Sequence, residues 1–362
     1  MWFTGKGDPT EETYGFKRQN WWQPVGREVR MLRERAGIID ISNFAKYGIT
    51  GPGAEAWLEA VFANRMPKAI GRACLTPFIG KRGGVAGDFT VSRLAADEFL
   101  IVGSGMAERY HHRFFNAFPL PRGTSFRSRT EELCGFNVAG PRSRELLQRL
   151  TNADLGNAAF PFMRAARIVV AGIAVVAIRI SFTGDLGWEL HCAASDQVAL
   201  LEALLAAGRD TGAGFVGSLA LLSLRVEKGY GSWGRDYSIE YWPQESGLAK
   251  LVGADKDFLN KAAWQKIAGE APRELLTYLE IDADDADATG GEPILPLDGT
   301  PTGQVSSRAY GYSVGRSLAI AYLKTGLARP GDKIHVALLG QPHAARVLET
   351  PVFDAEGRRL RA

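Results

Sequence analysis

The sequence predicts an α+β protein in which a mixed region of helices and strands is followed by an all-β domain. Residues 1–271 switch irregularly between helical and strand patterns, without the regular order of βαβ units. Residues 272–362 carry strand patterns separated by turns. The chain has 362 residues, 46% of them hydrophobic and 23% charged, which is a globular composition too long for one ordinary core. We therefore expect two domains, 1–271 and 272–362.

Each element follows from a local pattern. Helices are expected where apolar residues recur every three or four positions: residues 24–37, 53–65, 106–118, the second half of 134–150, 195–212, 218–229 and a segment from about residue 256. Strands are expected at residues 44–51, 89–91, 99–102, two or three times within 166–192, and at 274–281 and beyond. Residues 47–62 and 134–150 both read strand, Gly-Pro, helix, which suggests an internal structural repeat.

The composition argues against several classes of protein. A formal net charge of only +3 gives no argument for nucleic-acid binding. The three cysteines form no CxxC pair and the five histidines show no ligand spacing, so we expect neither a disulfide framework nor a metal site. The longest apolar run, residues 168–180, is shorter than the ~20 residues that span a bilayer. The N-terminal residues lack the pattern of a signal peptide, so we expect a cytoplasmic protein with no membrane partner.

A glycine-rich stretch that ends in an acid, GKRGGVAGDFTV (residues 80–91), is the first candidate for chemistry. Asp88 stands at the start of an apolar strand pattern. The stretch is either an ordinary hairpin or a place where a large ligand packs against the backbone and meets the acid. In VGSGMAE (102–108), Glu108 takes the place of the third glycine of a dinucleotide-binding loop, so we expect a plain strand-to-helix turn there.

A second candidate is SFTGDLGWELH (residues 181–191), where a tight turn leads into a strand. Glu189, beside Trp188, could pair with a heterocycle that presents two parallel N–H donors. The alternative is a β-turn with an exposed glutamate.

A third candidate is LRVEKGYGSWGRD (residues 224–236), at the end of an apolar helix. Arg225 could bind an anionic or carbonyl group, and Trp233 could stack on a ring. The alternative is a helix end with salt-bridged charges. His111 and His112 lie among aromatic residues without an acid or cysteine partner, and we expect them to be structural.

Together and in this order, these stretches resemble the folate-dependent aminomethyltransferase family, typified by the T-protein of the glycine cleavage system. GGVAGDFTV is similar to the family's strand with its active-site aspartate, FTGDLGWEL to its Y-T-G-E-x-G-x-E motif, and SLRVEKG to its L-R-x-E-x-G segment. GQVSSRAYGYSVGRSLAIAYL is similar to the start of its C-terminal barrel domain. Residues 18–59 are closest to the folate-binding half of dimethylglycine and sarcosine dehydrogenases.

The resemblance implies a three-domain cloverleaf around a central folate-binding cavity, with two α+β subdomains in residues 1–271 and a C-terminal β-barrel. It implies tetrahydrofolate as the cofactor, with Asp88 as the catalytic group near the N5/N10 edge. The glycines before Asp88 would let the backbone approach the pterin. Glu189 would pair with the pyrimidine edge of the pterin.

The same resemblance implies the rest of the site. Arg225, Trp233, Gly103 and Ser104 would complete the cofactor site, where Trp233 lines the pocket. Tyr237 and Trp188 would contact the substrate, and aromatic rings such as those of Trp233 and Tyr237 could hold an onium centre by cation–π contact.

The sequence departs from the family pattern in two places. The T-protein has two adjacent acids where this chain has Gly87-Asp88, and Asp185 stands where the family often has glutamate, which we expect to be tolerated. The segment EKGYGSWG has no cysteine, so it does not match the K-G-C-Y motif of the related iron–sulfur-cluster assembly branch.

Three functions remain open. The first is transfer of one carbon from an amine-derived iminium or formaldehyde to tetrahydrofolate. The second is tetrahydrofolate-dependent demethylation of an N-, S- or O-methyl compound, and the third is a non-catalytic folate-binding subunit. The expected partners are a small-molecule methyl or aminomethyl donor and a flavin-dependent amine oxidase or dehydrogenase. Because the sequence shows no flavin-binding loop, we expect the chain alone not to oxidise an amine.

Overall fold

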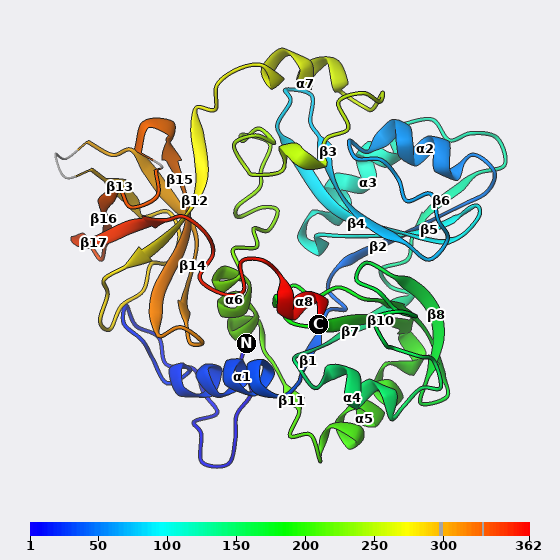
Figure 1. Ribbon diagram of the computed structural model, residues 1–362, viewed down its shortest axis with the longest axis horizontal. Helices are drawn as coiled ribbons and strands as arrows, with labels where there is room; N and C mark the ends of the chain where they lie inside the picture. Colours follow the sequence, from blue (N-terminus) through cyan, green and yellow to red (C-terminus); the bar gives the residue numbers. More distant parts are fainter. Residues whose placement is uncertain (297–299, 328) are drawn as a thin grey trace.

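The computed structural model, which describes residues 1–296, 300–327 and 329–362, places three lobes around helix α6 (Figure 1). The first lobe is an antiparallel sheet in the order β3-β4-β5-β2-β6. Its strands are β2 (Ala45–Thr50), β3 (Ala73–Ile79), β4 (Val85–Ala95), β5 (Glu98–Gly103) and β6 (Ser125–Ser128). Helices α2 (Ala54–Val61) and α3 (Glu108–Ala117) cover it, and the short helix η1 (Gly105–Ala107) precedes α3. Phe115 of α3 meets the rings of Trp57, Phe62 and Phe89, so the core of this lobe is largely aromatic.

The second lobe is a six-stranded sheet in the order β11-β1-β7-β10-β9-β8. Its strands are β1 (Gly37–Asp40), β7 (Leu133–Ala139), β8 (Ala165–Val170), β9 (Ile173–Ile178), β10 (Gly187–Ala193) and β11 (Gly214–Phe215). Helices α4 (Ser143–Gln148) and α5 (Gln197–Gly208), with η2 (Ala194–Asp196), cover one face. The other face meets the first lobe, where Val102 and Leu100 pack with Ile178. The two lobes therefore share buried apolar surface.

The third lobe is a closed antiparallel barrel in the order β12-β15-β14-β13-β16-β17. Its strands are β12 (Glu274–Ile281), β13 (Pro293–Leu295), β14 (Gly303–Gly311), β15 (Arg316–Lys324), β16 (Lys333–Leu338) and β17 (Gln341–Leu348), with η4 (Thr325–Leu327) after β15. Closure leaves no free sheet edge. The register of β14 against β15 shifts between Val305 and Ser307, which marks a β-bulge at Ser306.

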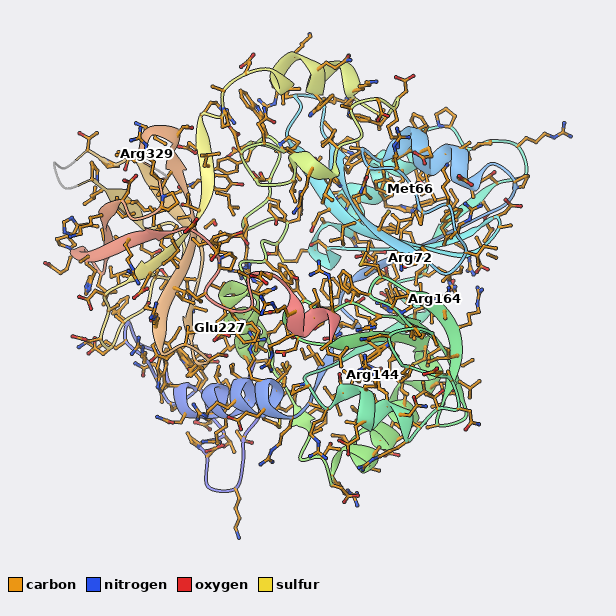
Figure 2. The ribbon with its side chains drawn as sticks, viewed as in Figure 1. Met66, Arg72, Arg144, Arg164, Glu227 and Arg329 are labelled. Carbon is orange, nitrogen blue, oxygen red and sulfur yellow. The ribbon has the colours of Figure 1, made fainter. Side chains whose placement is uncertain are left out.

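Helix α6 (Ser218–Glu227) stands between the barrel and the other lobes (Figure 1). Glu227, labelled in Figure 2, accepts hydrogen bonds from Arg33 of α1 (Trp22–Glu34) and from Ser313 before β15. One buried carboxylate thus joins α1, α6 and the barrel. The remaining helices are η3 (Ala249–Leu251), α7 (Lys261–Ala268) and α8 (Arg358–Arg361).

The mixed α+β architecture and the C-terminal barrel are as the sequence predicts. Two expected boundaries differ: the first helix ends at Glu34 and residues 37–40 form β1, while β4 begins at Val85, ahead of Asp88. The two strand–Gly-Pro–helix segments are built alike, because Gly51 and Gly140 both turn the chain at positive φ, 113° and 119°. None of the helices in the part of the chain described has the length and apolar character needed to cross a membrane.

Candidate active site

Asp88 lies within β4, opposite Pro77 of β3. The residue keeps some contact with solvent, yet protein atoms surround its carboxyl closely. Burial raises the pKa of Asp88 to about 6, its own backbone amide acts in the opposite direction, and the negative charge of Asp236 raises it further. A carboxyl group that titrates near neutral pH can both take up and release a proton, as a general acid–base group must.

The glycines around Asp88 make room for the protein's own side chains. A β-carbon on Gly87 would lie 2.7 Å from a ring atom of Phe89, and one on Gly103 would lie 2.6 Å from the same ring. A β-carbon on Gly84 would meet the backbone oxygen of Ile239 at 2.0 Å. These close approaches give the glycines a packing role within the protein, and their contact with a pterin stays a prediction.

Gly103 and Ser104, at the end of β5, lie beside the Asp88 strand. Gly103 pairs with Phe89 on one side and with Ala45 of β2 on the other. Ser104 precedes helix η1 and is partly exposed. The structure therefore brings these two predicted residues next to Asp88.

Glu189 extends from β10 on the face opposite the α4–α5 core, and its side chain is 15% exposed. Within the described part of the chain, no group donates a hydrogen bond to its carboxylate; Nε2 of His191 lies nearest, 3.5 Å from Oε2. His191 is buried, and neither of its ring nitrogens has a hydrogen-bond partner there. A half-buried carboxylate without a donor is suited to accept hydrogen bonds from a ligand.

Lys46 is a buried cation near Glu189 that the sequence did not single out. Burial lowers the pKa of Lys46, and the charge of Glu189 is among those that act against this. Its ammonium group donates to the backbone oxygens of Ser42 and Phe44, each at 2.8 Å. The only signal in the sequence is a lysine between apolar residues in FAKYGIT, which is also the pattern of an ordinary exposed strand position.

Trp188 does not fit the expected role in substrate binding. Its side chain is fully buried in the core of the second lobe, on the opposite face of β10 from Glu189, and packs against Phe160. The alternation of side chains along a strand sends neighbouring residues to opposite faces, so one of the pair had to be internal.

Arg225 is held inside the protein, as the salt-bridged alternative expected. It is buried, donates to Asp236 at 2.8 Å and to the Tyr230 backbone oxygen at 2.9 Å, and reaches Ser307 of the barrel at 2.7 Å. Both terminal nitrogens of its guanidinium group thereby donate to the following loop and to the barrel. This corrects the expectation that Arg225 binds the cofactor.

Trp233 and Tyr237 lie in the loop of residues 230–243, next to the Asp88 strand. The ring of Trp233 stacks on Tyr110 of α3 at 5.6 Å, and its N–H donates to Val85 of β4 at 3.1 Å. Burial raises the pKa of Tyr237 well above its usual value, and the charge of Asp88 adds to this. Tyr237 and Asp88 therefore share one electrostatic environment.

Asp236 and His111 are the other residues of this region whose roles sequence reasoning missed. Asp236 is fully buried and accepts hydrogen bonds from Arg225, the Ser232 amide and Ser306. Its place in SWGRD shows only a polar residue in an aromatic loop. His111 was expected to be structural. It is buried, and in addition to its packing its ring nitrogen Nε2 lies within hydrogen-bond distance of the Ala86 backbone oxygen in β4.

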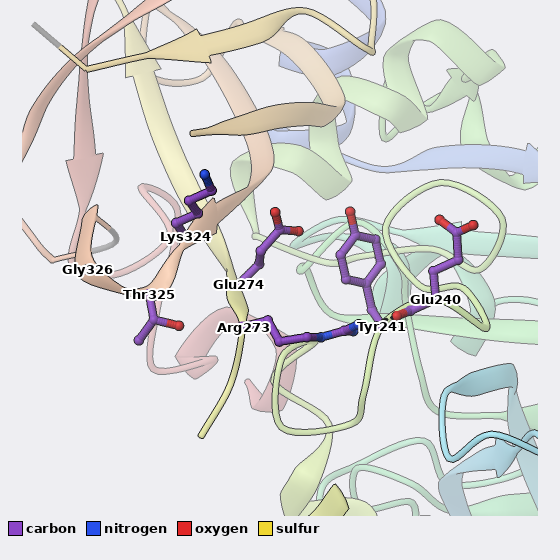
Figure 3. Close-up of a pocket in the computed structure, with 7 residues that line it drawn as sticks. All are labelled: Glu240, Tyr241, Arg273, Glu274, Lys324, Thr325 and Gly326. Atoms are coloured by element: carbon purple, nitrogen blue, oxygen red, sulfur yellow. Dashed lines mark hydrogen bonds between the residues drawn. The ribbon is translucent and has the colours of Figure 1, made fainter. Parts of the chain in front are cut away.

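An open cavity of about 680 Å³ lies at the far end of the same loop, between it and the barrel (Figure 3). Its lining consists of Glu240, Tyr241, Arg273, Glu274, Lys324, Thr325 and Gly326. It contains none of the predicted site residues, and charges of both signs stand around it. We therefore take Asp88 and Glu189, and not this surface cavity, as the candidate active site.

Comparison with known proteins identifies relatives along the whole chain. Residues 2–256 match the model of the GCVT N-terminal domain, and residues 275–354 match the glycine cleavage T-protein C-terminal barrel domain. Mitochondrial dimethylglycine dehydrogenase of Mus musculus is 35% identical over 99% of this chain and 42% of its own length. An aminomethyltransferase of Herpetosiphon aurantiacus is 29% identical over 92% of this chain and 91% of its own.

Two further matches agree with these. The formaldehyde-forming 4-methylaminobutanoate oxidase of Paenarthrobacter nicotinovorans is 31% identical over 99% of this chain and 44% of its own length. The crystal structure of glycine cleavage system aminomethyltransferase T from Bartonella henselae superposes with a TM-score of 0.84 at 20% identity, covering 97% of this chain and 96% of that one. The chain thus spans less than half the length of the dehydrogenase and oxidase relatives and nearly all of the transferase relatives.

Proposed function

The chain belongs to the glycine cleavage T-protein family, and from this premise we propose that it is a tetrahydrofolate-dependent one-carbon transferase. It would pass a one-carbon unit from a methylated amine, or from the iminium or formaldehyde derived from it, to tetrahydrofolate. The names of its relatives support this, since they include an aminomethyltransferase, a dimethylglycine dehydrogenase and a formaldehyde-forming oxidase.

The observation that carries the proposal is the carboxylate of Glu189. It is half-buried and receives no hydrogen bond from the described part of the protein, so binding a donor-bearing ring would satisfy it. The pyrimidine edge of a pterin presents such donors. The residues present therefore fit the group: Glu189 would accept hydrogen bonds from the pterin, and Asp88 with the end of β5 would lie at its reacting side.

Tetrahydrofolate, when bound, would supply the nucleophilic nitrogen that takes up the one-carbon unit. Asp88 would accept the proton that this nitrogen loses and would stabilise positive charge at the carbon. Partial burial strengthens that interaction, because fewer water dipoles compete with the carboxylate. Tyr237, which shares the environment of Asp88, would border the space for the donor.

The raised pKa of Asp88 favours an enzyme over a non-catalytic folate-binding subunit, since perturbed acids gather at sites of chemistry. Direct methyl transfer from an onium donor would use open aromatic faces. One face of Trp233 is already covered by Tyr110, so we rank transfer from an iminium or formaldehyde first.

We further propose a flavin-dependent amine oxidase or dehydrogenase as the source of the one-carbon unit. The support is that this chain spans 42% of the dimethylglycine dehydrogenase it resembles. A cytoplasmic location is proposed with it, and cell fractionation would test that.

The test is anaerobic calorimetric titration with tetrahydrofolate of the wild type and the variant Glu189→Gln. We expect micromolar binding that Glu189→Gln weakens by ~10- to 100-fold, as for loss of a charged hydrogen-bond acceptor. Glu98→Gln, at the far end of β5 in an ion pair with Arg167, is the matched control and should bind like the wild type. Absence of binding at millimolar tetrahydrofolate, or equal affinity in both glutamate variants, would contradict the proposal.

A further inference from the structure

A β-bulge immediately precedes Asp88. Phe78 pairs with Gly87 while Ile79 pairs with Val85, so Ala86 is an extra residue in β4. A bulge bends its strand and changes the direction of the side chains that follow. The direction of the Asp88 carboxyl therefore depends on how the bulge is held.

Three groups from outside the sheet hold the bulge. Nε2 of His111 lies 3.1 Å from the backbone oxygen of Ala86, and Nε1 of Trp233 donates to the backbone oxygen of Val85, also at 3.1 Å. The Val85 amide donates to the backbone oxygen of Tyr241 at 3.0 Å. The backbone oxygens of Val85 and Ala86 and the Val85 amide thus have partners on α3 and on the loop of residues 230–243.

The protonation of His111 follows from its surroundings. Burial lowers the pKa of His111 to about 4, so the ring is neutral near pH 7 and carries a single N–H. Because a carbonyl oxygen only accepts, that proton lies on Nε2 and is donated to Ala86. His111 also contacts the ring of Trp233, with centroids 5.1 Å apart, so the two donors support one another.

The loop that carries Trp233 is itself anchored at the bulge in β14 of the barrel. Asp236 accepts a hydrogen bond from Ser306, the bulged residue of β14, and the Asp236 backbone oxygen accepts one from Tyr322 of β15. The loop is therefore fixed on the barrel at Asp236 and reaches the first lobe through Trp233.

We propose that His111 and Trp233 are positioning residues that fix the bulge at Ala86 and so aim the Asp88 carboxyl at the reacting atoms. The catalytic consequence rests on the proposed function, whereas the control of Asp88 itself does not. Neither side chain needs to touch substrate or cofactor.

The experiment compares His111→Phe, which removes the donor, with His111→Gln, whose amide can still donate to Ala86. Trp233→Phe removes the second donor and keeps a ring. His112→Gln is the matched control, because His112 faces Tyr47 and Asn116 rather than β4.

The first readout is the titration of the Asp88 carboxyl group. Its carboxyl carbon resonance is followed by NMR as a function of pH and is identified by its loss in Asp88→Asn. The charge of Asp236 acts on this carboxyl and Tyr237 shares its environment, whereas His111 is neutral near pH 7, so the His111 variants remove no charge from the site.

The second readout is tetrahydrofolate affinity beside turnover of formaldehyde with tetrahydrofolate, after subtraction of the rate without enzyme. We expect His111→Phe and Trp233→Phe to displace the Asp88 titration and to lower kcat by ~10- to 100-fold, the scale of a misplaced catalytic group, with tetrahydrofolate affinity within about threefold of wild type. His111→Gln should retain most of the wild-type Asp88 titration and kcat, and His112→Gln should retain both in full.

An Asp88 titration and turnover unchanged in folded His111→Phe and Trp233→Phe would overturn the inference, as would equal damage in His111→Gln and His111→Phe. If His111→Phe does not fold, Trp233→Phe decides. If the wild type fails to bind tetrahydrofolate, the proposed function falls, while the titration of Asp88 still tests the inference.

Discussion

Arg225 donates a hydrogen bond to Asp236 at 2.8 Å, and both side chains are buried between α6, the loop of residues 230–243 and the barrel. The pair joins α6 to the loop that follows it, and Arg225 also reaches Ser307 of the barrel. The charge of Asp236 also raises the pKa of Asp88, so the same residue supports the fold and influences the candidate catalytic group.

Asp236→Asn should therefore be strongly destabilising. Removing the carboxylate leaves Arg225 buried without a counter-charge, which costs about 3–5 kcal/mol in comparable buried pairs. Chemical denaturation measures the loss. Asp255→Asn, which breaks an exposed pair with Arg65, is the control and should change stability by less than about 1 kcal/mol. Equal effects of the two variants would show that burial of the Arg225 pair is unimportant.

Asp88→Asn should keep tetrahydrofolate binding and lose turnover. A positioned acid–base group contributes at least ~10²-fold to rate, whereas an amide of the same shape leaves the site intact. Turnover of formaldehyde with tetrahydrofolate and calorimetric affinity are measured on the same preparation. Wild-type turnover in this variant would remove Asp88 from the chemistry.

The raised pKa of Asp88 also predicts how stability depends on pH. The folded chain holds the proton up to about pH 6 and the unfolded chain releases it near its ordinary value, 3.8, so ionisation penalises the folded state as pH rises between these values. Asp88→Asn escapes this penalty. It should match the wild type near pH 4 and exceed it by up to about 3 kcal/mol at pH 7, at ~1.4 kcal/mol per pKa unit. Denaturation curves that differ equally at both pH values would contradict the assignment.

Gly103→Ala separates packing from cofactor binding. Its β-carbon would lie 2.6 Å from the Phe89 ring, and such overpacking costs about 1–3 kcal/mol. Phe89→Leu in the same chain should relieve part of that cost, so the double mutant should be more stable than the sum of the single changes predicts. If Gly103→Ala weakened tetrahydrofolate binding at unchanged stability, the predicted cofactor role of Gly103 would be supported over the packing role.

The sequence predicted the architecture well where patterns are local. The strands around Asp88 and Glu189 follow from alternation, and the Gly-Pro turns after β2 and β7 follow from composition. The bulge at Ala86 could not be predicted, because it arises from the register between two strands and from donors on α3 and on a loop more than a hundred residues away. For the same reason Arg225 looked available for a ligand, although it is paired with Asp236 and Tyr230 of the following loop and with Ser307 of the barrel.

The position of α6 has a consequence for any attempt to divide the chain. Cutting the polypeptide near residue 271 would remove the barrel residues that Arg225 and Glu227 contact, Ser307 and Ser313. The N-terminal fragment would then expose Arg225 and Glu227 to solvent. Apolar residues that pack on the barrel, such as Val226, would be exposed beside them. We expect such a fragment to be insoluble or molten when expressed alone, and to recover a cooperative unfolding transition when the barrel fragment is supplied in trans.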